Sequence, residues 1–412
     1  MTYQPAEDTY LLLQSIKEHF KQQLQTNSLN TPLKICEVGC GSGEIITILK
    51  EQFSNQIEVY ATDINSQAVE DTLTLAKQKN ISITAKVGSF LEPYDNQVFD
   101  IIIFNTPYLP CEDGDRFDKL SIEDKALYGG KAGFEVTNQF LDSLHNYIHS
   151  QTQIYMLISS LTQPNVVEDC IIGNGLEFEL IATQNHFFEE LLVYKIQPAL
   201  VLQHLFENSY LNIVRFDKGR HSHILQARHP QTKKEVMIKF GKKQHIEKEI
   251  FFLQKLQDTS YAPKIVEFNI DIDSQSGFVM YEKIQGIQIE EFINSYRDNY
   301  TSLNELESVL NRVFEICYDL DIKGISKDEM THPQEHIFIN PDNLNEVFFI
   351  DFERSVLQHR FSNSRQFLQY CIRIGRVFEQ YGITLSREKA IEIGKSIIKR
   401  SIPVRIDEIY SK

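Results

Sequence analysis

Residues 99–108 read Phe-Asp-Ile-Ile-Ile-Phe-Asn-Thr-Pro-Tyr, an apolar run that ends abruptly in polar residues and a proline. The run Phe99–Ile103 is short, β-branched and without polar alternation, which is typical of a strand buried on both faces. Open α/β sheets bind their ligands just beyond the carboxyl ends of such strands. We therefore expect an α/β fold with a binding site at Asn105–Tyr108.

The residue types after this strand suit one kind of ligand. Asn105 offers a carboxamide oxygen and an NH2 group, and Pro107 restricts the backbone on both sides of its own nitrogen. Tyr108 supplies a flat face. A side-chain oxygen and a backbone carbonyl would accept both N–H bonds of a planar group such as an amide or an aminopurine. They would aim its nitrogen lone pair at an electrophile. The alternative is a strand-to-loop turn with an asparagine cap.

Residues 33–49 predict a strand, a glycine turn and a helix. Gly39, Gly41 and Gly43 stand at every second position and let a ligand lie against bare backbone. The helix that follows favours a carboxylate or phosphate at its N-terminus. The spacing is not that of dinucleotide-binding folds, and no lysine follows Gly43, which argues against a phosphate-cradling NTPase loop.

The next predicted strand ends in Asp63, about 20 residues beyond the last glycine, where an acid reaches ribose hydroxyls in nucleotide-type folds. A helix over 67–78 and a strand over 81–87 follow, which makes the strand before Asn105 the fourth. Further strands are predicted at 154–160 and 191–196. This alternation of strands and helices predicts a doubly wound sheet.

The 412 residues exceed one typical core, so two domains are expected. A formal charge of −16 argues against a general grip on nucleic acid and favours a protein partner. The six cysteines lack paired metal-ligand spacing. Without a membrane-spanning run or a signal-peptide pattern, the sequence predicts a cytoplasmic protein that does not engage a membrane.

Residues 3–196 resemble a class I S-adenosylmethionine-dependent methyltransferase with a Rossmann-like sheet. The resemblance is to the HemK-type branch that methylates glutamine in peptide-chain release factors, and within it to the eukaryotic and archaeal form. The motifs that carry it are Pro5–Thr9, Glu37–Gly43, Thr62–Asn65, Phe104–Tyr108 and Gly129–Val136.

The resemblance implies a methyltransferase domain over 1–197 that uses S-adenosylmethionine. The implied cofactor-binding residues are Thr9, Glu37, Gly39, Gly41, Gly43, Asp63, Ile64, Ser89 and Asn105. The implied catalytic residues are Asn105, Thr106, Pro107 and Tyr108. Asn105 and the Thr106 carbonyl would hold the amide nitrogen of the substrate, which would be a release factor. A small zinc-binding activator subunit is a further implied partner.

Four positions leave questions open. On spacing alone, Asp8 and Thr9 are also explained as caps of the helix that begins there. The family has Pro where Thr106 stands, which loosens the predicted turn while keeping its carbonyl. The family usually has Asp where Ser89 stands, which predicts weaker adenine binding.

In the second half, Lys239 lies inside a predicted strand, where a buried lysine is costly unless it is paired. Glu249, in the helical segment 246–256, is an available partner. A further apolar strand ends at Asp351, which is followed by a phenylalanine.

Residues 198–412 resemble a compact α+β protein-kinase-like domain of the RIO and archaeal small-kinase type. The resemblance implies an ATP site at Gly219, Lys239, Glu249, Glu329 and Asp351, with Mg²⁺ on Asp351. Much of the pattern departs from active kinases. The glycine-rich loop keeps only Gly219, residues 327–329 replace the catalytic motif, and His336 replaces the metal-binding asparagine. A pseudokinase docking module is the alternative.

The leading hypothesis is a release-factor glutamine N5-methyltransferase fused to a kinase-like, ATP-binding or regulatory domain. The nearest competing hypothesis is an N6-adenine or other amino-group methyltransferase, although the acidity and the absence of basic arms weigh against a nucleic-acid substrate. A third hypothesis is an atypical kinase or nucleotide-sensing scaffold with a secondary methyltransferase half. A fourth is a non-catalytic assembly factor in translation termination.

Overall fold

The computed structural model describes residues 5–26, 31–95, 97–111, 120–186, 188–217, 222–270, 275–297, 303–327, 330–358, 362–379, 384–398 and 410–411. The chain forms two compact units, residues 1–233 and 234–412. The first unit includes residues 198–233, which were expected to belong to the second domain. The predicted domain boundary between residues 197 and 198 stays a prediction.

Helices and strands alternate over most of the first unit, as expected. Its α-helices are α1 (Glu7–Thr26), α2 (Glu44–Phe53), α3 (Ser66–Gln78), α5 (Ile122–Lys125), α6 (Glu135–Ser143), α7 (Pro164–Gly173) and α8 (Leu200–Glu207). Its strands are β1 (Leu33–Val38), β2 (Ile57–Asp63), β3 (Thr84–Val87), β4 (Ile101–Asn105), β5 (Leu109–Pro110), β6 (Tyr128–Gly130), β7 (Gln153–Ser159), β8 (Leu176–His186), β9 (Glu189–Pro198), β10 (Leu211–Asp217) and β11 (Ser222–Arg228).

The main sheet has the strand order β3-β2-β1-β4-β7-β9-β8. The neighbouring strands β3, β2, β1, β4 and β7 are parallel, whereas β9 runs antiparallel to both β7 and β8. In this register Val38 lies beside both Thr62 and Phe104. The residues that follow, Gly39, Asp63 and Asn105, therefore meet at one edge of the sheet. This confirms the doubly wound, Rossmann-like fold predicted for the N-terminal part.

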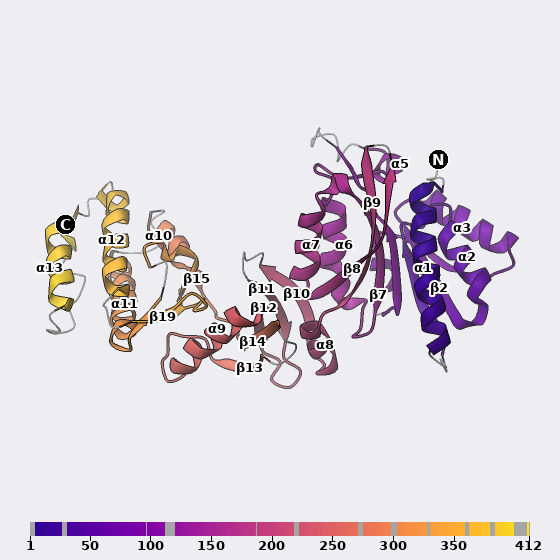
Figure 1. Cartoon of the computed structure of the whole chain (residues 1–412). Helices are drawn as coiled ribbons and strands as arrows, with labels where there is room; N and C mark the ends of the chain where they lie inside the picture. The colour runs from indigo at the N-terminus through magenta and orange to yellow at the C-terminus, as the bar shows by residue number, and fades with distance from the viewer. Residues whose placement is uncertain are drawn as a thin grey trace. The chain divides into compact units, whose positions relative to one another are not determined.

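Helices cover both faces of this sheet (Figure 1), with α1, α2 and α3 on one side and α6 and α7 on the other. The apolar positions of α2 recur at helical spacing, so Ile46 and Leu49 are buried against the sheet. Phe20 of α1 joins Ile103 and Tyr155 in the same core cluster. This packing fixes β4 between its neighbours and so fixes where Asn105 emerges.

Strand β8 was not predicted from the sequence. Its side chains alternate in exposure, with Leu176 buried and Glu177 exposed. Because β8 is an edge strand paired only with β9, it lacks the continuous apolar run that marks β4 and β7.

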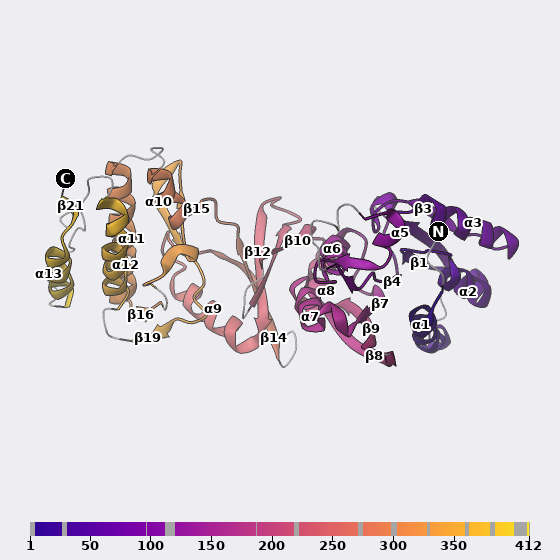
Figure 2. The same cartoon turned by 90° about the horizontal axis from the view of Figure 1, so that it is seen from above.

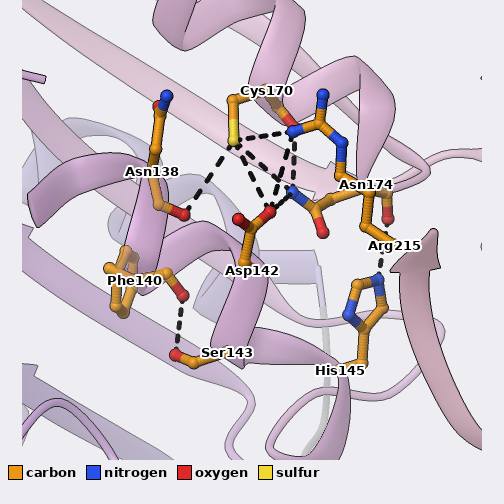
Figure 3. Close-up of polar contacts among 8 residues, drawn as sticks. All are labelled: Asn138, Phe140, Asp142, Ser143, His145, Cys170, Asn174 and Arg215. Carbon is orange, nitrogen blue, oxygen red and sulfur yellow. Dashed lines mark hydrogen bonds and ion pairs between the residues drawn. The ribbon is translucent and has the colours of Figure 1, made fainter. Parts of the chain in front are cut away.

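A polar cluster of mostly buried residues, with Asp142 exposed at its edge, joins α6 and α7 to β10 (Figure 3). The Arg215 Nη1 donates to the sulfur of Cys170 at 3.1 Å and lies 3.7 Å from the Asp142 carboxylate. The Asn174 side-chain NH2 donates to the same carboxylate at 2.8 Å. The backbone carbonyl oxygen of Asn174 lies 3.0 Å from a ring nitrogen of His145. The cluster therefore attaches the β10 strand to the helices of the first unit.

The second unit is α+β. Its helices are α9 (Lys243–Lys255), α10 (Ile289–Arg297), α11 (Leu303–Ile322), α12 (Asn363–Glu379) and α13 (Arg387–Ile398). Its strands are β12 (Glu235–Lys242), β13 (Ile265–Asn269), β14 (Ser276–Glu282), β15 (Ile287–Gln288), β16 (Ile325–Ser326), β17 (Ile337–Asn340), β18 (Asn343–Phe349), β19 (Val356–Leu357), β20 (Thr384–Leu385) and β21 (Tyr410–Ser411).

Within this unit β14 pairs antiparallel with both β12 and β13, and α9 packs against β12 and β14. A second antiparallel group contains β15, β17 and β18. Helices α11 and α12 lie side by side (Figure 2). Across the described residues of the whole chain, no helix is long and apolar enough to cross a membrane.

Candidate active site

A cavity of about 360 Å³ lies at the carboxyl ends of β1, β2 and β4, a size typical of small-molecule sites. The predicted site residues that line it are Gly39, Gly41, Asp63, Ile64, Ser89, Asn105, Thr106, Pro107 and Tyr108. Thr9, Glu37 and Gly43 do not line it. The fold thus gathers separate stretches of the chain around one cavity.

Asn105 is the last residue of β4, and its side chain is held in one orientation. Its Nδ2 donates to the Oδ2 of Asp8 at 3.1 Å. The Oδ1 is buried and has no hydrogen-bond partner among the described residues. A buried acceptor left unpaired is costly, so this atom indicates a place where a ligand N–H binds.

Asp8 also belongs to the site. From its position in the sequence alone, it was explained as a cap of the helix that begins there. It lies in the first turn of α1, is 4% exposed and lines the cavity. Its Oδ1 accepts the backbone N–H of Thr9 at 2.6 Å and the Thr9 hydroxyl at 3.3 Å. Thr9 therefore supports Asp8, and its predicted contact with the cofactor stays a prediction.

The loop after Asn105 is fixed from two sides. The Thr106 N–H and hydroxyl both donate to the carbonyl of Leu157 on β7, at 3.3 and 2.7 Å. On the other side β5 pairs with β6. There a Cβ on Gly129 would lie 2.3 Å from the Pro107 carbonyl oxygen. Only glycine permits this approach, so the glycine motif at 129–133 braces the loop.

The tyrosine of this loop lines the cavity with an apolar ring and a neutral hydroxyl. Burial raises the pKa of Tyr108, and the negative charges of Asp8 and Glu189 raise it further. At neutral pH the Tyr108 hydroxyl therefore stays protonated.

Asp63 joins the end of β2 to the glycine turn. Its two oxygens accept the backbone N–H of Gly41 at 3.0 Å and of Asn65 at 2.8 Å. Burial raises the pKa of Asp63, although these two hydrogen bonds work in the opposite direction. A carboxylate has about four acceptor positions, so both oxygens keep capacity for ribose hydroxyls.

Glu37 lies behind the turn. Its Oε2 accepts the backbone N–H of Ile46 in the first turn of α2 at 3.1 Å, and the side chain is 4% exposed. Burial raises the pKa of Glu37 to about 8. Gly43 precedes α2 with a φ of 77° and packs against Thr72. Both residues shape the turn from outside the cavity, and their predicted contact with the cofactor stays a prediction.

Ser89 and Phe90 form another part of the cavity wall. Phe90 has a φ of 47°, which a non-glycine residue adopts only under constraint. Its ring lies 6.2 Å from that of Phe104 and 5.7 Å from that of Phe140, measured between centroids. The result is an apolar aromatic wall that suits a flat ring system.

These features fit S-adenosylmethionine. The acid at the end of β2 suits ribose hydroxyls, the wall at Phe90 suits adenine, and the turn at Gly39 and Gly41 exposes backbone. The unpaired Oδ1 of Asn105 remains for a substrate N–H. Ser89 lines the cavity where the resembling family has Asp, and its weaker hold on adenine stays a prediction.

The second unit contains a buried ion cluster around Lys239 of β12. The Lys239 Nζ lies 2.7 Å from an oxygen of Asp351, 3.1 Å from one of Glu353 and 3.3 Å from one of Glu249. The predicted pairing of Lys239 with Glu249 is therefore present. Glu353 is a partner that was not predicted from the sequence, although it lies only two residues beyond Asp351.

Further contacts fix this cluster in place. The Glu249 Oε2 also accepts the backbone N–H of Phe352 at 2.7 Å, and the Lys327 Nζ donates to the Asp351 carbonyl at 2.6 Å. Burial opposes ionisation of Asp351, but Lys239 and Lys327 outweigh it and lower its pKa to about 2. Burial raises the pKa of Glu249.

The remaining predicted nucleotide-site residues, Gly219 and Glu329, lie outside the described residues. Within the described part of the chain, no group of three or more His, Cys, Asp or Glu side chains could hold a metal ion. The Mg²⁺ site at Asp351 stays a prediction.

Comparisons with known proteins concern the first unit. A family model described as "Methyltransferase domain" matches residues 29–187. A putative protein N5-glutamine methyltransferase of Methanocaldococcus jannaschii is 30% identical over 46% of this chain and 89% of its own length. The eRF1 methyltransferase catalytic subunit mtq2 of Schizosaccharomyces pombe is 30% identical over 38% and 71%. The Homo sapiens methyltransferase HEMK2 is 28% identical over 42% and 79%.

Proposed function

The chain belongs, through its N-terminal part, to the family of S-adenosylmethionine-dependent protein N5-glutamine methyltransferases, and we propose that it methylates a glutamine side chain of a class I peptide-chain release factor. The observation that carries the proposal is the buried, unpaired Oδ1 of Asn105 at the wall of the cavity. The names of the relatives support the choice of substrate, since the fission yeast protein is an eRF1 methyltransferase.

In this proposal the chain acts mainly by positioning. Bound S-adenosylmethionine supplies a methyl group on a positively charged sulfur, which keeps the electron pair of the broken bond. The Asn105 Oδ1 and the Thr106 carbonyl accept the two N–H bonds of the substrate amide. They thereby turn its lone pair away from amide resonance and toward the methyl carbon. Tyr108 packs on the planar amide. The nitrogen releases one proton to water as the new bond forms, and alignment supplies much of the rate.

A direct test compares release factor and DNA as substrates of the purified chain with S-adenosylmethionine. Mass spectrometry is expected to find one added methyl group on a release-factor glutamine and none on DNA. Methylated adenine in DNA would instead support the N6-adenine hypothesis. Absence of transfer to release factor, with cofactor bound and the activator subunit supplied, would contradict the proposal.

Asn105→Ala is expected to abolish methyl transfer while S-adenosylmethionine still binds, because the carboxamide contacts the substrate and the rest of the cavity is kept. Asn208→Ala is a matched control. It removes an exposed carboxamide that bonds to the His204 carbonyl at the end of α8, away from the cavity. Normal transfer by Asn105→Ala would exclude its proposed role.

We further propose that a second subunit assists the enzyme. The fission yeast relative is described as a catalytic subunit, and the resemblance specifies a small zinc-binding activator. Transfer by the purified chain alone, with a rate that an added activator leaves unchanged, would contradict this part of the proposal.

For the second unit we propose nucleotide binding with Mg²⁺. The observation that favours it is the Lys239 cluster, because a buried lysine held by several carboxylates is costly and such perturbed groups gather at functional sites. In the proposed state Glu249 positions Lys239, the ammonium group of Lys239 holds a phosphate, and Asp351 turns to the metal ion.

Calorimetry with ATP and Mg²⁺ tests this second proposal. We expect metal-dependent binding that is lost in Lys239→Ala and Asp351→Ala. Lys234→Ala is the matched control, because it removes an exposed lysine that is paired with Glu282 outside the cluster. If the folded wild-type chain does not bind ATP, the cluster is a structural element of a docking module.

A further inference from the structure

We propose that Asp8 is a positioning residue that fixes the orientation of the Asn105 carboxamide and so makes the cavity selective for an N–H donor. The inference rests on the proposed function, because it concerns the group that would bind the substrate amide. Asp8 acts in it through Asn105 and contacts no reacting atom.

The geometry allows only one assignment of the Asn105 side chain. An ionised carboxylate accepts hydrogen bonds and donates none. The atom 3.1 Å from the Asp8 Oδ2 must therefore be the NH2 nitrogen of Asn105. A flipped carboxamide would set oxygen against oxygen in a buried place, where an unpaired polar contact is most expensive. Asp8 thus commits Oδ1, the unpaired atom, to accepting a hydrogen bond from a ligand.

Asp8 is itself held rigidly. Its other oxygen accepts from the N–H and the hydroxyl of Thr9, at 2.6 and 3.3 Å. The first turn of a helix also favours a negative charge, because its backbone N–H groups point toward that end. A side chain that is 4% exposed and bonded at both oxygens cannot swing away from Asn105. Its position is therefore set by α1.

The consequence is a defined cost when Asp8 is replaced. In Asp8→Leu the Asn105 carboxamide can rotate, so the substrate amide meets either an acceptor or a donor. Misplacement of a positioning group costs about 100-fold in rate. In Asp8→Asn the new side-chain oxygen can still accept from Asn105, so this variant is expected to keep a larger part of the rate.

The first experiment measures kcat and KM for the release-factor substrate, together with the cofactor Kd. We expect kcat to fall about 100-fold in Asp8→Leu and less in Asp8→Asn, with cofactor affinity unchanged. Glu7→Gln is the matched control, because it removes the neighbouring first-turn carboxylate, which contacts His186 instead of Asn105. Equal kcat in wild type and Asp8→Leu would overturn the inference.

A double-mutant cycle separates positioning from a general structural role. Because Asn105→Ala is expected to leave no transfer to measure, the cycle uses the Kd of the release factor. If Asp8 acts through Asn105, Asp8→Leu weakens release-factor binding in the wild-type background and causes little further loss in an Asn105→Ala background. A structural role would weaken binding by the same factor in both backgrounds, and that result would overturn the inference. If Asp8→Leu does not fold, Asp8→Asn takes its place in the same double-mutant cycle.

A final readout does not depend on activity. In protein carrying isotope-labelled asparagine, the NH2 protons of Asn105 are expected to exchange slowly with water in wild type and faster in Asp8→Leu. Unchanged exchange would overturn the role of Asp8. If wild type fails to methylate release factor, the proposed function fails, while this measurement still decides whether Asp8 fixes Asn105.

Discussion

Gly129→Ala tests whether the rigidity of the Asn105–Tyr108 loop sets the rate. An added Cβ would lie 2.2 Å from the Gly133 carbonyl oxygen and 2.3 Å from that of Pro107. Ordinary contacts of a Cβ begin near 3.4 Å. The Pro107 carbonyl must therefore retreat by the difference, 3.4 − 2.3, or about 1 Å. A shift of that size beside the reacting group costs about 100-fold in rate, and the overpacking costs about 1–3 kcal/mol of stability.

The assay combines methyl-transfer kinetics, cofactor binding by calorimetry and unfolding by denaturant. We expect kcat to fall about 100-fold in Gly129→Ala. The cofactor Kd should stay within about threefold of wild type, because Gly129 does not line the cavity. A folded variant with wild-type kcat would refute the idea that the contact at Gly129 fixes the Asn105–Tyr108 loop for methyl transfer. Loss of cofactor binding would show that the effect is not confined to this loop.

Three further results are expected. Native Glu37 keeps its proton to about pH 8 while the unfolded chain loses it near 4.5, so wild-type stability falls as pH rises through that window. Between about pH 5 and pH 8, the free energy of unfolding of Glu37→Gln should fall by at least about 1 kcal/mol less than that of wild type, because glutamine does not titrate. Denaturation at each pH measures the difference. Thr106→Val should lower the free energy of unfolding by about 1 kcal/mol, because it removes the hydroxyl hydrogen bond to the Leu157 carbonyl. Thermal unfolding measures this loss. Arg215→Lys should lower the free energy of unfolding by a similar amount, because it keeps a positive charge near Asp142 but loses the planar guanidinium group. Methyl transfer should stay unchanged.

The sequence could place the edge of the sheet that carries the cavity because the signals there are local. The strand ending at Asn105 is a continuous apolar run, and β1 leads directly into the glycine turn. Once the strands are known to be parallel and adjacent, Gly39, Asp63 and Asn105 must meet. These positions could therefore be predicted without coordinates.

The sequence could not reveal contacts that depend on long-range docking. Asp8 and Asn105 are 97 residues apart, and only the packing of α1 on the sheet brings them together. At the sequence level a carboxylate in the first turn of a helix is explained equally well as a cap. Glu37 shows the same limit, because its place beside the glycine turn predicts a ligand contact, and only the fold reveals that its side chain also accepts a hydrogen bond from the backbone of α2.

Thr106 illustrates how a departure from the family pattern can be offset. A proline there would restrict the unfolded chain and stabilise the turn by about 0.4–1 kcal/mol. Thr106 instead donates twice to the Leu157 carbonyl, and one hydrogen bond contributes about 0.5–1.5 kcal/mol net. The two restraints are of similar size, and the bonds to β7 hold Thr106 directly against the sheet that positions Asn105. The replacement therefore leaves the proposed role of the Thr106 carbonyl intact, because that role needs a fixed backbone rather than a particular side chain.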